Sequence, residues 1–178
     1  MRFKRTRRGI ESAPDEVESA VLRQCVTDLL TLLGTEQEAT GDPLEALLGL
    51  PSGESVRPED PALARLLPDA YSDDDPEASR EFRRYTEGDL LAAKRAHCAT
   101  VLATLPAAGT FRLDRDQADA WLGCLNDLRL VLGARLEVTD DLGQDPLPGS
   151  DPRAQAMQVY GWLGWLQESL LGCLTPRR

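Results

Sequence analysis

The sequence predicts a mainly α-helical fold, a single-domain helical bundle around a central buried helix with a small N-terminal β element. The first observation is the segment WLGCLNDLRLVLGARLEVT, Trp121–Thr139, which is apolar on nearly every side of a helix, as helices at the centre of a domain normally are. The second is an apolar stripe at three-to-four spacing on each longer helical segment. The third is a series of Asp-Pro dipeptides before helical patterns, where aspartate caps the first turn and proline loses no hydrogen bond.

The length of 178 residues suits one domain. We find no internal repeat and no linker long enough to divide the chain. Residues 1–178 are therefore expected to form a single domain, with 1–12 as a basic arm or short strands and 13–178 as the helical body.

The first elements are two short strands and a helix. We expect the strands to be joined by a turn at Gly9 and to cover Phe3–Thr6 and Ile10–Ser12. A helix from about Pro14 to Leu33 follows, and Gly34 suits the left-handed position just after a helix. The expected core-facing stripe of this helix is Val17, Val21, Cys25, Leu29 and Leu32.

Asp-Pro dipeptides divide the middle of the chain. The helices expected after them cover, in chain order, Leu44–Leu48, Pro61–Leu67 and Pro76–Tyr85. Thr86 with Asp89 then offers a new helix start. The helix that begins there is expected to run to about Leu105, with Lys94 and Cys98 on its narrow apolar stripe.

The last third is predicted to hold a strand, the central helix and a final helix. Thr110–Leu113 is a candidate strand that can pair with the N-terminal one, and Asp114 with Gln117 forms a capping-box arrangement before the central helix. An acidic loop covers residues 140–150. The last helix is expected from Pro152 to Leu174, with the stripe Val159, Leu163, Leu166 and Leu170.

The net charge of −10 is unevenly distributed. Residues 1–8 hold five basic residues and no acid, which leaves 15 basic and 30 acidic residues for the rest of the chain. An acidic body argues against a broad phosphate-binding face and favours solubility or a basic partner. No stretch approaches the roughly 18 apolar residues of a membrane span, and no apolar signal segment follows the basic N-terminus. We therefore expect a cytoplasmic protein without membrane contact.

The basic arm is the candidate nucleic-acid contact. An extended arm of eight residues reaches roughly 26 Å, beyond the ~8 Å screening length at physiological salt. The acidic body is therefore compatible with DNA contact through the arm. The alternative is an edge strand whose charges guard against aggregation. The cations concerned are Arg2, Lys4, Arg5, Arg7 and Arg8.

Little in the sequence indicates catalysis or metal binding. The single histidine, His97, is next to Cys98, and adjacent helical positions point about 100° apart, which does not suit a Cys-His nucleophile. We therefore expect no enzyme activity, no metal and no cofactor. Two acidic clusters lack an EF-hand register and are expected to be solvated loops and caps: Asp73–Asp75 with Glu77, and Asp140, Asp141 and Asp145.

The four cysteines, Cys25, Cys98, Cys124 and Cys173, are redox candidates. They show no close pair in sequence and no metal-ligand spacing, which is typical of a reduced cytoplasmic protein. All four fall on or near apolar helix stripes, where a free cysteine is usually a small core residue. A redox role requires an exposed thiol whose thiolate is stabilised by an electropositive setting.

Asn126, Asp127 and Arg129 are the sharpest polar feature of the central helix. Buried charge is tolerated only when it is fully paired, and Arg129 would suit a bidentate carboxylate partner. One interpretation is a structural network that ties the central helix to its neighbours. The other is a grip on a ligand or a partner.

Three long stretches and the opening FKRTRRG carry a family resemblance. The stretches are DPALARLLPDAYSDDDPEASREFRRYTEGDL (Asp60–Leu90), WLGCLNDLRLVLGARLEVTDD (Trp121–Asp141) and YGWLGWLQESLL (Tyr160–Leu171). Together they resemble the actinobacterial domain-of-unknown-function family 2017, also called the AosR family of oxidative-stress regulators, over nearly the whole chain.

The resemblance implies a cytoplasmic, non-enzymatic, redox-linked transcriptional regulator that works through protein contacts such as a sigma factor, with a homodimer left open. A thiol switch would be easiest with two cysteines close in sequence, and this chain has none. Its switch therefore requires distant cysteines that meet in the fold or bridge two subunits. Two other functions stay open: a small-ligand-binding or enzymatic protein that uses the Asn126–Arg129 segment, and a plain adaptor without a thiol switch.

Overall fold

The computed structural model describes residues 1–34, 58–68, 76–138, 148 and 151–175. Within these ranges the fold is mainly helical with a small three-stranded sheet, which confirms the predicted class. The expected helix Leu44–Leu48 and the acidic residues Asp73–Asp75, Asp140, Asp141 and Asp145 lie outside the described residues. The elements are β1 Lys4–Thr6, β2 Gly9–Ser12, α1 Glu16–Leu32, α3 Pro61–Leu66, α4 Pro76–Thr104, β3 Phe111–Leu113, α5 Arg115–Arg135 and α6 Ala154–Leu174.

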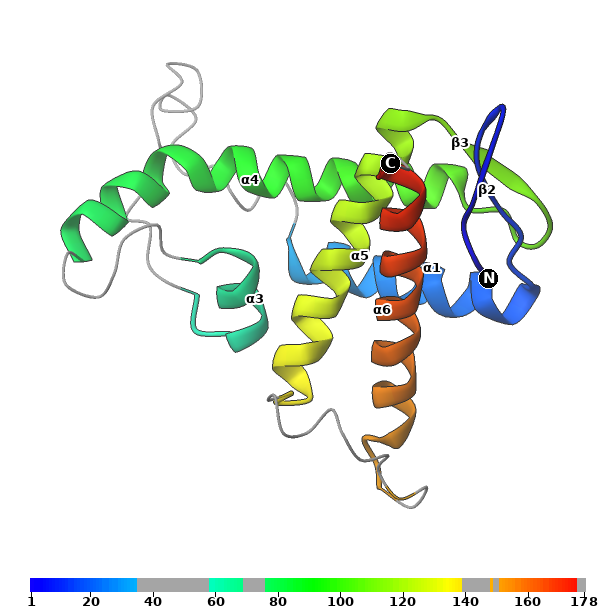
Figure 1. Cartoon of the computed structure of the whole chain (residues 1–178). Coiled ribbons are helices and arrows are strands. Elements are labelled where there is room, and N and C mark those ends of the chain that lie inside the picture. Colours follow the sequence, from blue (N-terminus) through cyan, green and yellow to red (C-terminus); the bar gives the residue numbers. More distant parts are fainter. Residues whose placement is uncertain (35–57, 69–75, 139–147, 149–150, 176–178) are drawn as a thin grey trace.

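Helix α5 is the centre of the bundle. It contacts α4, α6, α3 and α1, and in Figure 1 it runs beside α6 and crosses α4 and α1. The predicted capping box begins it: the Asp114 side chain accepts from the Gln117 N–H, and the Gln117 side chain accepts from the Asp114 N–H. The helix ends at Arg135, not at Thr139, because Glu137 takes a left-handed conformation with φ 53°.

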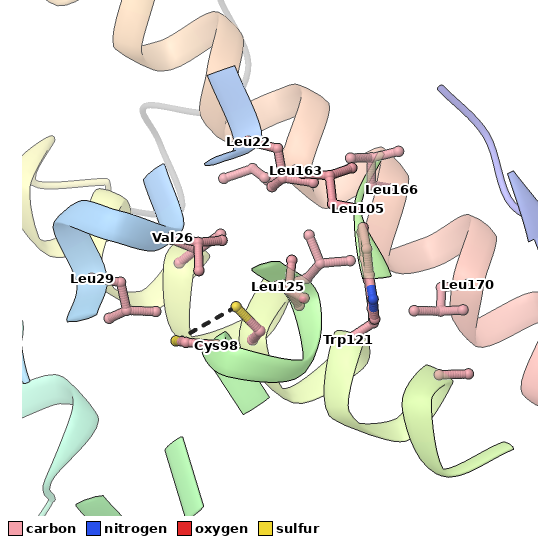
Figure 2. Packing of buried hydrophobic residues seen from close by; sticks show 14 of the residues in the cluster. Leu22, Val26, Leu29, Cys98, Leu105, Trp121, Leu125, Leu163, Leu166 and Leu170 are labelled. Carbon is pink, nitrogen blue, oxygen red and sulfur yellow. Dashed lines mark hydrogen bonds between the residues drawn. The ribbon is translucent and has the colours of Figure 1, made fainter. Parts of the chain in front are cut away.

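The hydrophobic core lies where α1, α4, α5 and α6 meet, as Figure 2 shows. Trp121 at its centre is fully buried, and its indole N–H donates to the Thr104 hydroxyl at 2.8 Å. Each large apolar side chain buried here contributes about 1.5–3 kcal/mol before the entropy cost of ordering it. The predicted stripe of the last helix is confirmed for Leu163, Leu166 and Leu170, all fully buried. That helix begins at Ala154, two residues after the predicted Pro152.

The apolar stripe predicted for α1 is confirmed at Leu29, which is buried, but was wrong by one position in the first half of the helix. Val17 is 71% exposed and Cys25 is half-buried, whereas Leu22 and Val26 are fully buried. A run of apolar residues at spacings of three and four contains two adjacent stripes, and the packing against α4 and α5 selects one. The limits of α1 agree with the prediction, since Asp15 caps its start in a capping box and Gly34 follows its end with φ 68°.

Helix α4 is one continuous element. The predicted break with a new start at Thr86 was wrong, because the Thr86 hydroxyl donates to the Phe82 carbonyl at 2.9 Å inside the helix instead of capping a new one. Two arginines tie α4 to α1. Arg95 donates to the carbonyls of Leu33 and Gly34 at the end of α1, and Arg23 of α1 donates to the Leu102 and Leu105 carbonyls at the end of α4. The carbonyls that a helix end leaves unpaired are thereby satisfied.

The sheet has the antiparallel order β1-β2-β3, with Arg5 opposite Ile10 and Ile10 opposite Leu113. The predicted pairing of Thr110–Leu113 with the N-terminal strands is confirmed, whereas the turn lies at residues 7–8 and Gly9 already belongs to β2. Gly9 is required there. Its φ is +129°, and a Cβ would approach the Leu113 carbonyl oxygen to 2.7 Å.

Aromatic packing holds the sheet against the helices. The Phe3 and Phe111 rings lie 5.5 Å and 5.3 Å from the Trp121 ring, and the Phe3 N–H donates to the Ser169 hydroxyl of α6 at 3.4 Å. The basic N-terminal strand is thus fixed beside the C-terminal half of α6, as Figure 1 shows.

Candidate functional site between helices α4 and α5

Two cysteines that are distant in sequence meet at the interface of α4 and α5. The sulfurs of Cys98 and Cys124 lie 3.8 Å apart, with exposed fractions of 0% and 1%. Figure 2 marks their contact with a dashed line inside the core. This is the close thiol pair that the sequence alone does not show.

The local sequence explains how the two helices come so close. Cys98 lies on the predicted stripe of α4, and Gly123 precedes Cys124 on α5. A Cβ at Gly123 would lie 2.5 Å from His97 Nδ1, so the absence of a side chain lets the imidazole lie against the α5 backbone. Glycine at this position thus permits the approach of α4 and α5 next to the thiols.

An ion pair lies one helical turn from the thiols. Lys94 Nζ donates to Asp127 Oδ1 at 2.7 Å, and the two side chains are only 12% and 4% exposed. Lys94 is four residues before Cys98 and Asp127 is three residues after Cys124, spacings that put each charge on the same helix face as its thiol. The α4–α5 interface therefore contains a thiol pair and, one helical turn away, a nearly buried ion pair.

The two thiols are electrostatically different. The hydrogen bond from the Cys124 thiol lowers the pKa of Cys98 below the ordinary cysteine value, against the opposing effects of burial and of the Asp127 carboxylate. The same hydrogen bond, followed by burial, raises the pKa of Cys124. The lowered pKa favours Cys98 as the thiolate of the pair, a state in which the Cys124 thiol would donate the hydrogen bond between the two sulfurs.

The other two cysteine candidates lie apart from this pair. Cys25 on α1 is half-buried, and burial, followed by the charge of Asp28, raises the pKa of its thiol. Cys173 is 9% exposed near the end of α6. All four cysteines lie in the described part of the chain, and none of them forms a disulfide.

The polar residues of the central helix divide between two neighbours. Asp127 faces α4 through Lys94, whereas Asn126 and Arg129 face α6. The expected carboxylate partner of Arg129 was wrong: its Nη1 donates to the Gln167 amide oxygen at 2.6 Å, because the facing position of α6 holds an amide. Gln167 in turn donates to the Asn126 side chain at 3.4 Å.

An aromatic ring also lies against Arg129, whose buried Nε has no hydrogen-bond partner among the described residues. Its guanidinium carbon lies 5.3 Å from the centre of the Tyr160 ring, a cation–π contact that accompanies the amide hydrogen bond. A Cβ at Gly164 would lie 3.3 Å from Arg129 Nε, so glycine makes room for the guanidinium on α6. The sequence reasoning missed Gln167 and Tyr160, whose roles depend on which face of α6 meets α5.

The basic arm forms an exposed edge strand and its turn. Lys4 and Arg5 are in β1, Arg7 and Arg8 are in the turn, and Arg2 precedes the strand. All five side chains are exposed. The strand lies next to α6 near Ser169, whose hydroxyl accepts from the Phe3 N–H, whereas Arg129 contacts Gln167 and Tyr160 of the same helix.

Among the residues that the structure describes, no group of three or more histidine, cysteine or carboxylate side chains is placed to hold a metal ion. In the same part of the chain, none of the helices combines the length and apolarity needed to cross a bilayer.

The sequence is similar to known proteins over nearly its whole length. The profile of the family described as Domain of unknown function (DUF2017) matches residues 1–174. The oxidative stress regulator AosR of Mycobacterium tuberculosis (strain ATCC 25618 / H37Rv) is 38% identical over 175 residues, which cover 90% of this chain and 80% of the relative. The putative oxidative stress regulator AosR of Mycobacterium leprae (strain TN) is 37% identical over 173 residues, covering 89% and 78%. No solved structure matches.

Proposed function

This chain belongs to the DUF2017 family, and on that premise we propose that it is a non-enzymatic, redox-linked regulator of the oxidative-stress response that acts through protein contacts, with Cys98 and Cys124 as its redox couple. The names of its relatives support the stress-related role. The observation that carries the redox assignment is the 3.8 Å contact between the two sulfurs.

A disulfide between these cysteines requires a small movement. An S–S bond is about 2.05 Å long, so the sulfurs must approach by about 1.8 Å. Because both side chains sit on facing helices, rotation about their χ1 bonds and a small shift of α4 against α5 supply that approach. Oxidation would then join the two helices covalently.

The chemistry needs only a peroxide as oxidant. The Cys98 thiolate attacks one peroxide oxygen, the O–O bond breaks, and the leaving oxygen takes up a proton, which gives a sulfenic acid on Cys98. The Cys124 sulfur then attacks the Cys98 sulfur and loses its proton, and the hydroxyl group leaves as water. The two thiols give up two electrons to the peroxide, and one disulfide forms.

Burial of the pair makes oxidation a conformational event. Cys98 and Cys124 are 0% and 1% exposed as residues, so peroxide reaches their sulfurs when α4 and α5 open locally. The Lys94–Asp127 pair, one turn away, must adjust when the disulfide draws the helices together. We propose that this shift of α4 alters the surface that a partner protein reads.

The polar residues of the central helix support the non-enzymatic part of the proposal. Asp127 is paired with Lys94, and Arg129 is engaged by Gln167 and Tyr160. In this proposal they connect helices and do not serve as acid, base or substrate ligand. The partner we propose is a component of the transcription machinery such as a sigma factor, met in the cytoplasm, where thiols are kept reduced.

Disulfide mapping of the full chain tests the redox couple. Trypsin cleaves after Arg95, Arg112, Arg115 and Arg129, which places Cys98 on peptide 96–112 and Cys124 on peptide 116–129. After hydrogen peroxide treatment and alkylation, we expect these two peptides to be joined. The C25S and C173S variants should retain the cross-link, and C98S and C124S should lose it. Four alkylated thiols after treatment, or a cross-link between other cysteines, would contradict the assignment.

Partner binding tests the regulatory part. The reduced and the peroxide-treated protein are each used to capture purified RNA polymerase core and sigma factors. We expect binding that differs between the two states in the wild type and is constant in C98S. Binding that is identical in both states of the wild type would instead identify a plain adaptor.

A further inference from the structure

A groove runs between the basic edge strand and the last helix. It has a cavity volume of about 1010 Å³ and is lined on one side by residues 2–5 and on the other by α6 residues that include Trp165, Glu168 and Ser169. A second hollow of about 420 Å³ continues past Trp165, and Arg2 and Lys4 line both hollows. The two hollows are neighbours, because they share Arg2, Lys4 and Trp165, and together they are here called the β1–α6 groove.

Strand β1 presents a strand edge to this groove. In the described part of the chain β1 pairs with β2 alone, so its other edge has no strand beside it. The Phe3 N–H already reaches towards α6, where the Ser169 hydroxyl accepts it at 3.4 Å. An exposed strand edge is a template for one further extended segment, which binds through main-chain hydrogen bonds.

The side chains around the unpaired edge of β1 determine which kind of extended segment can bind there. Arg2, which precedes β1, and Lys4, its first residue, are both exposed, and both line the two hollows, so two cations lie at the groove. Trp165 is 45% exposed on the facing helix. The groove therefore offers two cations and one large ring for an apolar side chain.

We propose that the β1–α6 groove binds an extended acidic peptide segment of a partner protein, which aligns with the free edge of β1, pairs its carboxylates with Arg2 and Lys4, and packs an apolar side chain on Trp165. The inference rests on the proposed function in one respect only, that the chain works through a protein partner. It adds the chemistry of that partner's contact segment.

Charge favours a peptide over nucleic acid in this groove. Glu168 lines one hollow and Glu11, whose carboxylate is paired with Arg112, lines the other, and residues 9–178 carry twice as many acidic as basic residues. A continuous phosphate backbone would meet these charges, whereas a short acidic segment needs to satisfy only the cations at the strand. Phosphate oxygens can accept from the N–H groups of a strand edge, but a phosphodiester has no donor for the carbonyl groups of that edge, whereas a peptide main chain pairs with both.

Peptide display on the full-length protein tests the proposal. A library of random peptides is selected against the wild type, with the K4E variant as counter-selection. The enriched peptides are expected to combine acidic residues with an apolar or aromatic one. The affinity of a synthetic enriched peptide, measured by calorimetry, should fall by about tenfold or more in K4E and in W165A.

Matched controls are available in the same elements. Arg7 is a cation of the same hairpin that does not line the groove, and Leu171 is an apolar α6 residue, 50% exposed, that also lies outside it. R7E and L171A should bind the peptide as the wild type does. Circular dichroism checks that each variant is folded, which is expected because all the substituted side chains are exposed.

The inference would be overturned if the enriched peptides lacked acidic residues, or if K4E bound the peptide with the affinity of the wild type. It would also be overturned if no peptide were enriched and the protein instead bound a DNA duplex, with this binding abolished in K4E and W165A. The last result would assign the groove to nucleic acid. The same measurements on the C98S variant separate this inference from the redox proposal, because the groove does not include Cys98. Peptide binding that survives in C98S supports the groove whatever the outcome of disulfide mapping.

Discussion

Loss of one partner of the Lys94–Asp127 pair should destabilise the protein strongly, although loss of both should not. The charges lie 2.7 Å apart in a site where the side chains are 12% and 4% exposed. At an effective dielectric constant of about 20, that distance corresponds to an attraction of about 6 kcal/mol, most of which the desolvation of the two groups offsets. Removing one partner leaves the other charge buried alone, which costs about 3–4 kcal/mol.

The double substitution K94M/D127L removes both charges and keeps apolar bulk at the interface. We expect its free energy of unfolding to lie within about 1 kcal/mol of the wild type, whereas K94M and D127L alone each lose about 3–4 kcal/mol. Urea denaturation followed by circular dichroism measures all four proteins of this cycle, and an unchanged m-value shows that the comparison concerns the folded state.

An exposed ion pair within α5 serves as the control. Arg115 and Asp119 lie 2.9 Å apart with side chains 66% and 50% exposed, and their coupling energy should stay below about 0.5 kcal/mol. If the coupling of Lys94 with Asp127 is no larger than that of the control pair, the interface is more hydrated than its geometry implies. The reasoning on this ion pair would then be refuted.

Two further predictions concern local geometry. The free energy of unfolding of G123A should be about 1–3 kcal/mol lower than that of G161A, because the new Cβ at position 123 meets His97 at 2.5 Å. At Gly161 nothing lies within 4 Å of a Cβ, and alanine there gains helix propensity of about 1 kcal/mol. Equal urea midpoints of the two variants would contradict this prediction. For Asp60, desolvation acts to raise the pKa, but hydrogen bonds from the first turn of α3 and from Arg135 outweigh it and lower the pKa below its usual value. The stability that Asp60 contributes is therefore present above its unfolded-state pKa of about 3.9 and is lost as the pH falls through the lower folded-state value. Hydrogen exchange of the α3 amides should accordingly accelerate on acidification in the wild type. An equally steep acceleration in D60N would argue against this role of Asp60.

Helix starts and the central position of α5 could be predicted from the sequence because the responsible interactions are local. The Asp114–Gln117 capping box needs only residues three apart, and the all-round apolarity of the segment after it requires a buried place. Asp60 likewise caps α3 through the N–H groups of Ala62 and Leu63. In each case the side chain and its backbone partner lie within one turn.

The features that escaped prediction depend on tertiary contacts. Spacing alone did not decide between the two adjacent stripes of α1, and packing chose the one with Leu22 and not Val17. Thr86 had a helix-start pattern, but a threonine can equally bond to the carbonyl four residues before it, and it does. The partner of Arg129 on α6 depends on the relative rotation of two helices.

The thiol pair shows the same limit. Cys98 and Cys124 were each placed on apolar helix faces by the sequence, but their contact depends on how α4 crosses α5. The one local signal was Gly123 beside Cys124. A glycine inside a helix often has a packing reason, namely the close approach of a second element. The sequence gives four candidates, and the fold brings two of them, Cys98 and Cys124, into contact.

The central claim, that Cys98 and Cys124 form one redox couple, is tested most directly by a redox titration of the C25S/C173S variant in glutathione buffers. The fraction of protein with both thiols alkylated is measured at each potential. The account predicts one two-electron transition, with a slope of about 30 mV per tenfold change in the ratio of disulfide to dithiol, that disappears when Cys98 is also replaced by serine. Complete alkylation of both thiols across the whole range of buffers would contradict it.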